Sequence, residues 1–199
     1  MYRGMFLAQT IPKQKNKEKT IMKLRTITQL AAVAAAYVVL TYAFGFIAYG
    51  DVQFRIAELL ILLCFFRKDY AIPLIIGCAI ANIPSPLGIV DVAFGTAGTV
   101  FAALGVIFVS RHQKWFGRPW IALAAASLFP VFMNGLWVGW ELHLFLDLPF
   151  LASALSVAFG ELVVVTFVGV PLFSLLANNR NFMHLIDPGS TNAINGDGE

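Results

Sequence analysis

The chain has 199 residues, of which 59% are hydrophobic and only 13% are charged, with a formal net charge of +3. A soluble domain carries about 25% charged residues, and a soluble fold of this size could not hide so much apolar surface. The composition therefore excludes a disordered chain, a disulfide scaffold and almost any water-soluble enzyme, and it indicates an all-α protein that crosses a membrane several times.

Six apolar stretches, each bounded by polar or turn residues, follow one another along the chain. They cover about 27–49, 56–66, 70–83, 92–110, 120–140 and 150–177. Four reach the ~20 residues that a spanning helix needs, and none alternates as a barrel strand does. The second and third are short. If they formed a re-entrant hairpin, the charges at 67–69 would lie near mid-bilayer at ~2.5 kcal/mol or more each. We therefore predict a bundle of six transmembrane helices.

The distribution of basic residues predicts the orientation of this bundle. With six spans, 13 of the 14 Lys and Arg residues lie on one side, and the exception is Arg55. Because cytoplasmic segments carry an excess of Lys and Arg, we expect both termini in the cytoplasm of a multi-pass cell-membrane protein. Residues 1–22 are expected to be a basic tail, 23–177 the membrane domain, and 178–199 a disordered tail. The first 21 residues are alternatively a start-site artefact.

Several polar side chains interrupt the apolar stretches, nearly all in the outer half of this topology. They are Gln53, Arg55, Glu58, Asn82, Asp91, Asn134, Glu141 and Glu161. Glu161 lies about 11 residues into the last stretch, or roughly 16 Å along a helix, which is near the midplane. Because polar groups at membrane depth are costly, we interpret the set as an outward-facing site for a small polar solute, with one carboxylate at its floor.

Each of these residues has a structural alternative. Arg55 and Glu58 are three residues apart, so they could simply pair along one helix face. Asp91 could cap the start of the fourth helix.

The later residues have similar alternatives. Asn134 could join two helices, and Glu141 and His143 could be interfacial surface residues. Glu161 is the hardest to explain structurally, since a mid-span carboxylate needs a partner such as Arg55 or a cationic ligand.

The first stretch carries closely spaced small residues. The pairs Ala31/Ala35 and Ala32/Ala36 have the spacing that lets another helix approach closely. That helix belongs either to the same bundle or to another protein.

Motifs of catalysis and metal binding are missing from the sequence. It contains no phosphate-binding loop, no His-Glu-x-x-His and no Gly-x-Ser-x-Gly. Cys64 and Cys78 lie in apolar stretches and are expected to be buried thiols, too few for a metal site. The basic residues flank the spans, which the membrane explains without nucleic acid. We therefore expect neither an enzyme nor a cofactor or metal in this chain.

Four blocks of sequence resemble the QueT family over about residues 23–176. Gln53-Phe54-Arg55-Ile56-Ala57-Glu58 resembles its Gln-Phe-Arg-Ile-Ser-Glu signature, with Ala57 in place of Ser. The later blocks are Gly77–Asn82 followed by Asp91 and Gly95-Thr96, then Asn134–Gly139, then Gly160-Glu161. The resemblance implies the S component of an energy-coupling factor (ECF) transporter, a six-helix protein that binds a vitamin-like solute from outside.

The same resemblance implies partners and a substrate. S components associate with a transmembrane coupling protein and two ATPases, so ATP would be used by those subunits, and the alanine face would contact the coupling protein. The implied solute is a queuosine precursor, 7-aminomethyl-7-deazaguanine or a queuine-like base. We expect Glu58 and Glu161 to divide its guanine-like edge and its ammonium group between them. Gln53, Arg55, Asn82 and Asn134 would supply the remaining hydrogen bonds.

Three other functions remain open from the sequence. One is an S component for a different vitamin. Another is an intramembrane enzyme that uses Glu161 with Glu141 or Asp91 as acid and base. The third is a ligand-free assembly protein in which Glu161 and Arg55 form a structural ion pair.

Overall fold

The computed structural model describes the backbone of residues 11–45 and 54–186, and the side chains from residue 24 onward in those ranges. The elements are α1 (Ile11–Ala43), η1 (Ile56–Leu62), α3 (Leu63–Phe66), η2 (Lys68–Tyr70), α4 (Ala71–Asn82), α5 (Ile89–Arg111), η3 (Gln113–Phe116), α6 (Pro119–Leu146), α7 (Phe150–Glu161), η4 (Leu162–Gly169), α8 (Val170–Ala177) and α9 (Arg180–Ile186). No strand occurs in this part of the chain, so the predicted all-α class is confirmed.

Four helices are long and apolar enough to cross a membrane. They are Leu24–Ala43, Ile89–Arg111, Pro119–Leu146 and Phe150–Ala177, the last formed by α7, η4 and α8 together. Each coincides with one of the four long apolar stretches. The two short stretches also form helices, η1 with α3 and η2 with α4. Both are shorter than a usual span, so the count of six crossings stays a prediction.

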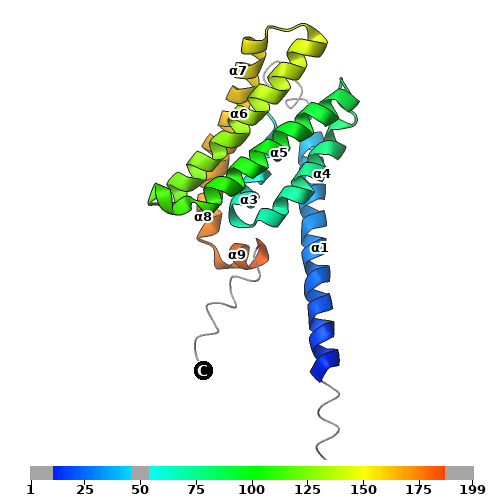
Figure 1. Ribbon diagram of the computed structural model, residues 1–199, viewed down its shortest axis with the longest axis vertical. Coiled ribbons are helices and arrows are strands. Elements are labelled where there is room, and N and C mark those ends of the chain that lie inside the picture. The colour runs from blue at the N-terminus through cyan, green and yellow to red at the C-terminus, as the bar shows by residue number, and fades with distance from the viewer. Residues whose placement is uncertain (1–10, 46–53, 187–199) are drawn as a thin grey trace, which may run out of the picture.

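Five helices pack side by side around a short central segment. In the order α1, α4, α5, α6 and α7, each contacts the next (Figure 1). The segment η1 contacts α1, α4, α5, α6 and η4, so it lies inside the bundle. Ile61 and Leu62 are accordingly 1% and 0% exposed. A helix enclosed by protein need not match the thickness of the lipid, which explains how so short a segment is tolerated here.

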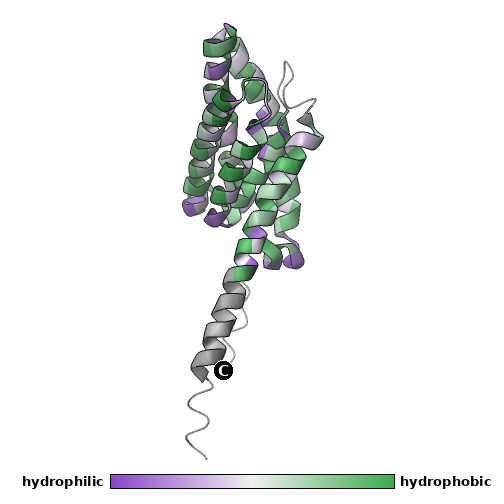
Figure 2. Cartoon of the chain, turned by 90° about the vertical axis from the view of Figure 1, so that its right-hand side faces the viewer, coloured by the Kyte–Doolittle hydropathy of each residue, from purple (hydrophilic) through white to green (hydrophobic). Residues whose placement is uncertain are grey.

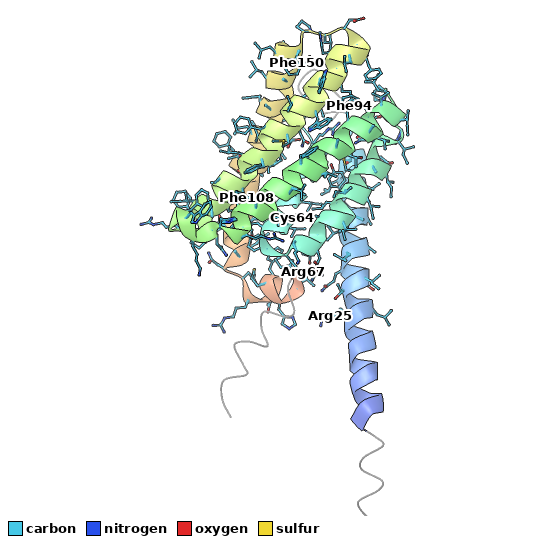
Figure 3. All side chains as sticks on the ribbon, viewed as in Figure 1. Arg25, Cys64, Arg67, Phe94, Phe108 and Phe150 are labelled. Carbon is cyan, nitrogen blue, oxygen red and sulfur yellow. The ribbon has the colours of Figure 1, made fainter. Side chains whose placement is uncertain are left out.

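The two ends of the bundle differ in polarity. Hydrophobic residues make up most of the helices over their height, and hydrophilic residues gather at the lower loops (Figure 2). Arg25 and Arg67 lie toward this lower end, and Phe94 lies near the other (Figure 3). The turn that follows α3 therefore lies at one end of the bundle. This arrangement favours two short spanning helices over a re-entrant hairpin that would place the charges at 67–69 near the middle of the bilayer.

The end of the fifth apolar stretch differs from the prediction. The fifth apolar stretch was expected to end at Trp140, but α6 continues to Leu146 and so contains Glu141. Its end is set by Asp147, which adopts the left-handed conformation with φ of 54°. Asp tolerates that conformation better than most residues do.

The expectation of a disordered tail from residue 178 is wrong for residues 180–186, which form α9. The end of α9 packs onto the bundle, and Ile186 is 5% exposed. Its carbonyl accepts hydrogen bonds from Arg67 Nη1 at 3.0 Å and from Tyr70 Oη at 2.8 Å. These bonds satisfy a carbonyl that a helix end leaves without a partner. At the other terminus, α1 begins at Ile11, so residues 11–22 continue the first helix.

Candidate functional site

A group of polar side chains is buried where η1 enters the bundle. Glu58 and Asn134 are 0% exposed, Glu161 is 1% and Arg55 is 7% exposed. Asn82, at the end of α4, is 2% exposed. Four different elements supply these side chains, so the tertiary fold creates the cluster. We call these five residues the central cluster.

Glycines on α5 make room for this cluster. A Cβ atom at Gly95 would lie 2.6 Å from Asn82 Nδ2 and 3.4 Å from Arg55 Nη1. A Cβ atom at Gly98 would lie 2.6 Å from Asn134 Oδ1. Both positions therefore require the smallest residue, because polar groups of neighbouring helices occupy the space.

The two carboxylates of the central cluster are each held by one donor. Tyr37 donates its hydroxyl proton to Glu58 Oε1 at 2.5 Å, and Asn134 Nδ2 donates to Glu161 Oε1 at 2.9 Å. The remaining acceptors, Glu58 Oε2, Glu161 Oε2 and Asn134 Oδ1, are buried and have no hydrogen-bond partner among the described residues. A buried polar atom without a partner costs about 1–3 kcal/mol. Three such acceptors in one place suit a ligand that brings hydrogen-bond donors.

The arrangement disfavours two of the structural alternatives. Arg55 interacts electrostatically with both Glu58 and Glu161. Yet within the described ranges the salt bridge found is Arg67 with Asp69, which lies in the turn after α3. The helix-face pair of Arg55 with Glu58 and the structural pair of Arg55 with Glu161 are therefore not formed. Their carboxylates bind Tyr37 and Asn134 instead.

A second acidic pair lies between α5 and α6. Asp91 is the third residue of α5, and the N-cap is Gly88, so the N-cap interpretation is wrong. Its Oδ2 accepts a hydrogen bond from the backbone N–H of Leu87 at 3.3 Å. Glu141 has no exposed surface, so it is not an interfacial surface residue, whereas His143 is exposed. Asp91 and Arg55 are the charged groups that act on Glu141.

Local features of the sequence position Glu161. It is the last residue of α7, and the π-helix η4 follows directly. The run Val163-Val164-Val165-Thr166 is β-branched and crowds a regular α-helix, and π-helical turns often accompany functional sites. Close contact of α6 with α7 also contributes, because a Cβ at Gly139 would lie 2.7 Å from Ala154 Cα.

Seven of the eight residues expected to bind the solute lie in these two groups. The eighth, Gln53, is outside the described residues. Sequence reasoning missed Tyr37, the donor to Glu58, although it stands out as a hydroxyl in the alanine-rich first stretch. It also missed Thr99, whose Oγ1 donates to Cys78 Sγ at 3.2 Å. Cys78 is buried as expected, but it also accepts a hydrogen bond from Asn82, so it forms part of the wall of the site.

The alanine face of α1 points away from the bundle. Ala31, Ala32, Ala35 and Ala36 are all exposed. The internal contact of α1 is made by the neighbouring Ala34, since a Cβ at Gly77 of α4 would lie 3.0 Å from its carbonyl oxygen. Beside this contact, Ala31, Ala34 and Ala35 line an open apolar groove of about 620 Å³ between α1 and α4. The exposed face is thus available to another protein or to lipid.

Comparison with known proteins identifies the family. The model of the family described as QueT transporter matches residues 27–178. This chain belongs to the QueT transporter family. The match covers every element of the bundle that supplies the two acidic groups, from α1 to α8.

A curated relative supports the same assignment. The chain is 34% identical over 146 residues to the queuosine precursor transporter QueT of Lactococcus lactis subsp. cremoris (strain MG1363). The aligned region covers 70% of this chain and 85% of that protein. No solved structure matches the chain. As a member of a transporter family with four long apolar helices, the protein is a multi-pass cell-membrane transporter and not an enzyme.

Proposed function

We propose that this QueT family member is the substrate-binding S component of an ECF-type importer and captures a queuosine precursor from outside the cell. The observation that carries the proposal is the central cluster, in which buried acceptors from three elements lack partners. The solute is 7-aminomethyl-7-deazaguanine or a queuine-like base, in keeping with the name of the Lactococcus relative.

The chemistry of the solute fits these acceptors. The guanine-like edge offers adjacent N–H donors, which Glu58 Oε2 and Glu161 Oε2 accept. Its carbonyl oxygen accepts from Arg55, or from Asn82 at the rim of the cluster. A site that buries such groups discriminates against solutes that leave its polar atoms unpaired.

The exposed alanine face supports an external partner. Small residues allow the close helix approach that substitutes for the hydrophobic effect inside a membrane. In this proposal a transmembrane coupling protein packs on Ala31, Ala32, Ala35 and Ala36, and its two ATPases drive release of the solute into the cytoplasm. Both termini lie in the cytoplasm, as the distribution of Lys and Arg indicates. This chain itself supplies binding and no ATP hydrolysis.

Thermal unfolding of the full chain in detergent tests the binding step. A ligand at ~100 times its dissociation constant adds ~2.7 kcal/mol, which corresponds to a shift of about 5–11 °C for a chain of this size. We expect this shift with 7-aminomethyl-7-deazaguanine and not with guanine or a panel of vitamins. Glu161→Gln should abolish it.

The exposed Asp147 provides the matched control, since Asp147→Asn makes the same acid-to-amide change outside the site. A shift with another vitamin alone would replace the substrate but keep the transporter class. The absence of any shift, in protein shown to be folded, would refute the proposed binding role.

A further inference from the structure

Asp91 on α5 and Glu141 on α6 form a distinct acidic pair, and aromatic contacts near them show where these two helices meet. Phe94, one turn after Asp91 on α5, contacts Trp137 with ring centroids 6.2 Å apart and Phe145 with centroids 6.0 Å apart. Trp137 and Phe145 lie one turn before and one turn after Glu141 on α6. In the same region the side chains of Asp91 and Glu141 interact directly across the two helices, at the end of the bundle where Phe94 lies (Figure 3).

This pair consists of two groups that only accept hydrogen bonds when ionised. Glu141 is 0% exposed, and among the described residues its carboxylate oxygens receive no hydrogen bond from a donor group and contact the carboxyl group of Asp91. Asp91 is 7% exposed and receives one backbone N–H from Leu87. Two buried carboxylates that face each other repel when both are ionised, so the pair either shares a proton or holds a cation between its oxygens.

The chain itself brings too few cations to this region. In the sequence, Arg55 is the only Lys or Arg between residues 26 and 66, and none occurs between 69 and 110 or between 119 and 179. Arg55 acts on three carboxylates, those of Glu58, Glu161 and Glu141, and the buried Asp91 is the fourth carboxylate of the region. One guanidinium cannot balance four carboxylates, so the region is built for an additional positive charge.

The geometry favours an organic cation over a metal ion. No group of three or more potential metal ligands of the His, Cys, Asp or Glu type occurs in the described ranges. Phe94 and Trp137 each lie one helical turn from a member of the pair and contact each other, and aromatic faces attract organic cations.

We propose that Asp91 and Glu141 form a subsite for the ammonium group of the solute, separate from the central cluster, which holds the ring edge. This inference rests on the proposed function and makes it more specific. It reassigns the ammonium group, because the sequence alone had divided edge and ammonium between Glu58 and Glu161. Each of those two carboxylates already receives a hydrogen bond from a donor side chain, whereas within the described ranges the only side chain that Glu141 contacts in this way is the carboxyl group of Asp91.

The test compares two solutes that share the deazaguanine ring and differ in one substituent, which is a positively charged aminomethyl group in one and a neutral nitrile in the other. Dissociation constants for 7-aminomethyl-7-deazaguanine and its neutral nitrile counterpart, 7-cyano-7-deazaguanine, are measured by equilibrium dialysis with the full chain in detergent. The wild type should bind the amine about 10- to 100-fold more tightly, the range expected for a charge-assisted hydrogen bond. Glu141→Gln and Asp91→Asn should each lower this ratio about tenfold or more.

Two controls separate the subsite from the rest of the site. Asp147→Asn, outside the site, should leave the ratio unchanged. Glu58→Gln should weaken both solutes, so that the ratio stays near its wild-type value. Thermal unfolding without ligand checks that each variant is folded. If Glu141→Gln is not folded, the test is decided on Asp91→Asn.

The outcomes distinguish the inference from the proposed function. A wild-type ratio near one, or an unchanged ratio in both subsite variants, overturns the subsite while the transporter still binds a deazaguanine. A ratio that falls in Glu58→Gln instead returns the ammonium group to the central cluster. If the wild type binds neither solute, the proposed substrate fails and the subsite fails with it.

Discussion

Replacing Gly98 by Ala should weaken binding of the solute and lower stability by a smaller amount. The new Cβ would lie 2.6 Å from Asn134 Oδ1 and 3.5 Å from Trp137 Cβ, so the Asn134 side chain has to move. Its hydrogen bond to Glu161, 2.9 Å long, is then lost. Loss of this positioning, worth about 1–3 kcal/mol for a buried polar group, corresponds to about 5- to 150-fold weaker binding of the solute.

The loss of this buried hydrogen bond also costs stability, but the strain is limited because the displaced atom is the end of a side chain. The added methyl group also improves helix propensity by up to ~1 kcal/mol, which offsets part of the strain. We therefore expect the unfolding temperature without ligand to change by only a few degrees. The assay is thermal unfolding in detergent, with and without 7-aminomethyl-7-deazaguanine.

Two other glycines provide matched Gly→Ala controls. At Gly105, also on α5, a Cβ would overlap the ring of Phe129, away from the polar cluster. Gly105→Ala should lower the unfolding temperature, at a cost of about 1–3 kcal/mol, and keep the ligand-induced shift. Gly45 has no atom within 4 Å of its added Cβ, so Gly45→Ala should change neither quantity. If Gly98→Ala binds the solute like the wild type, Asn134 does not position Glu161 for binding and the reasoning fails.

Three further changes test other parts of the structure. Ala35→Trp on the exposed face of α1 should abolish uptake by the assembled importer while solute binding persists. The control is Ala152→Trp at an exposed position of α7, which should still support uptake. Equal uptake by the two variants would show that α1 does not contact the partner. Tyr37→Phe removes the hydroxyl group that donates to the buried Glu58 and should weaken solute binding about 5- to 150-fold. Tyr42→Phe, on the exposed side of α1, is the matched control. Intact binding in Tyr37→Phe would contradict a role for the Tyr37–Glu58 hydrogen bond in binding. A chain ending at Asn179 lacks α9 and should unfold at a lower temperature but still bind the solute, and an unchanged unfolding temperature would show that α9 adds no stability.

The elements themselves were predictable from local patterns. The four long apolar stretches became the four long helices, since burial in a membrane requires continuous apolar surface and leaves the backbone little choice but a helix. The end of α6 was less predictable. An acidic residue after an apolar run usually marks the membrane surface, but Glu141 is enclosed by the neighbouring helix and the run continues past it.

The residues of the candidate site could be predicted from the sequence, but the hydrogen bonds between them could not. Charged and amide residues inside apolar stretches indicate a buried polar site in any membrane protein. Which of them meet was not readable, because Asn134 and Glu161 are 27 positions apart and Tyr37 and Glu58 are 21 apart. Such pairings depend on helix rotation and on glycine contacts between helices, neither of which leaves a pattern within one helix.

The sequence by itself determined that the protein is an all-α membrane protein and which residues are candidates for binding, because hydropathy and charge act locally along the chain. Only the tertiary structure decided how those candidates are divided. It separated a central cluster around Glu58 and Glu161 from a second pair at Asp91 and Glu141, and it turned the alanine face outward. The physical reason is that hydrogen-bond partners and burial are properties of neighbouring helices, and those neighbours are set by packing.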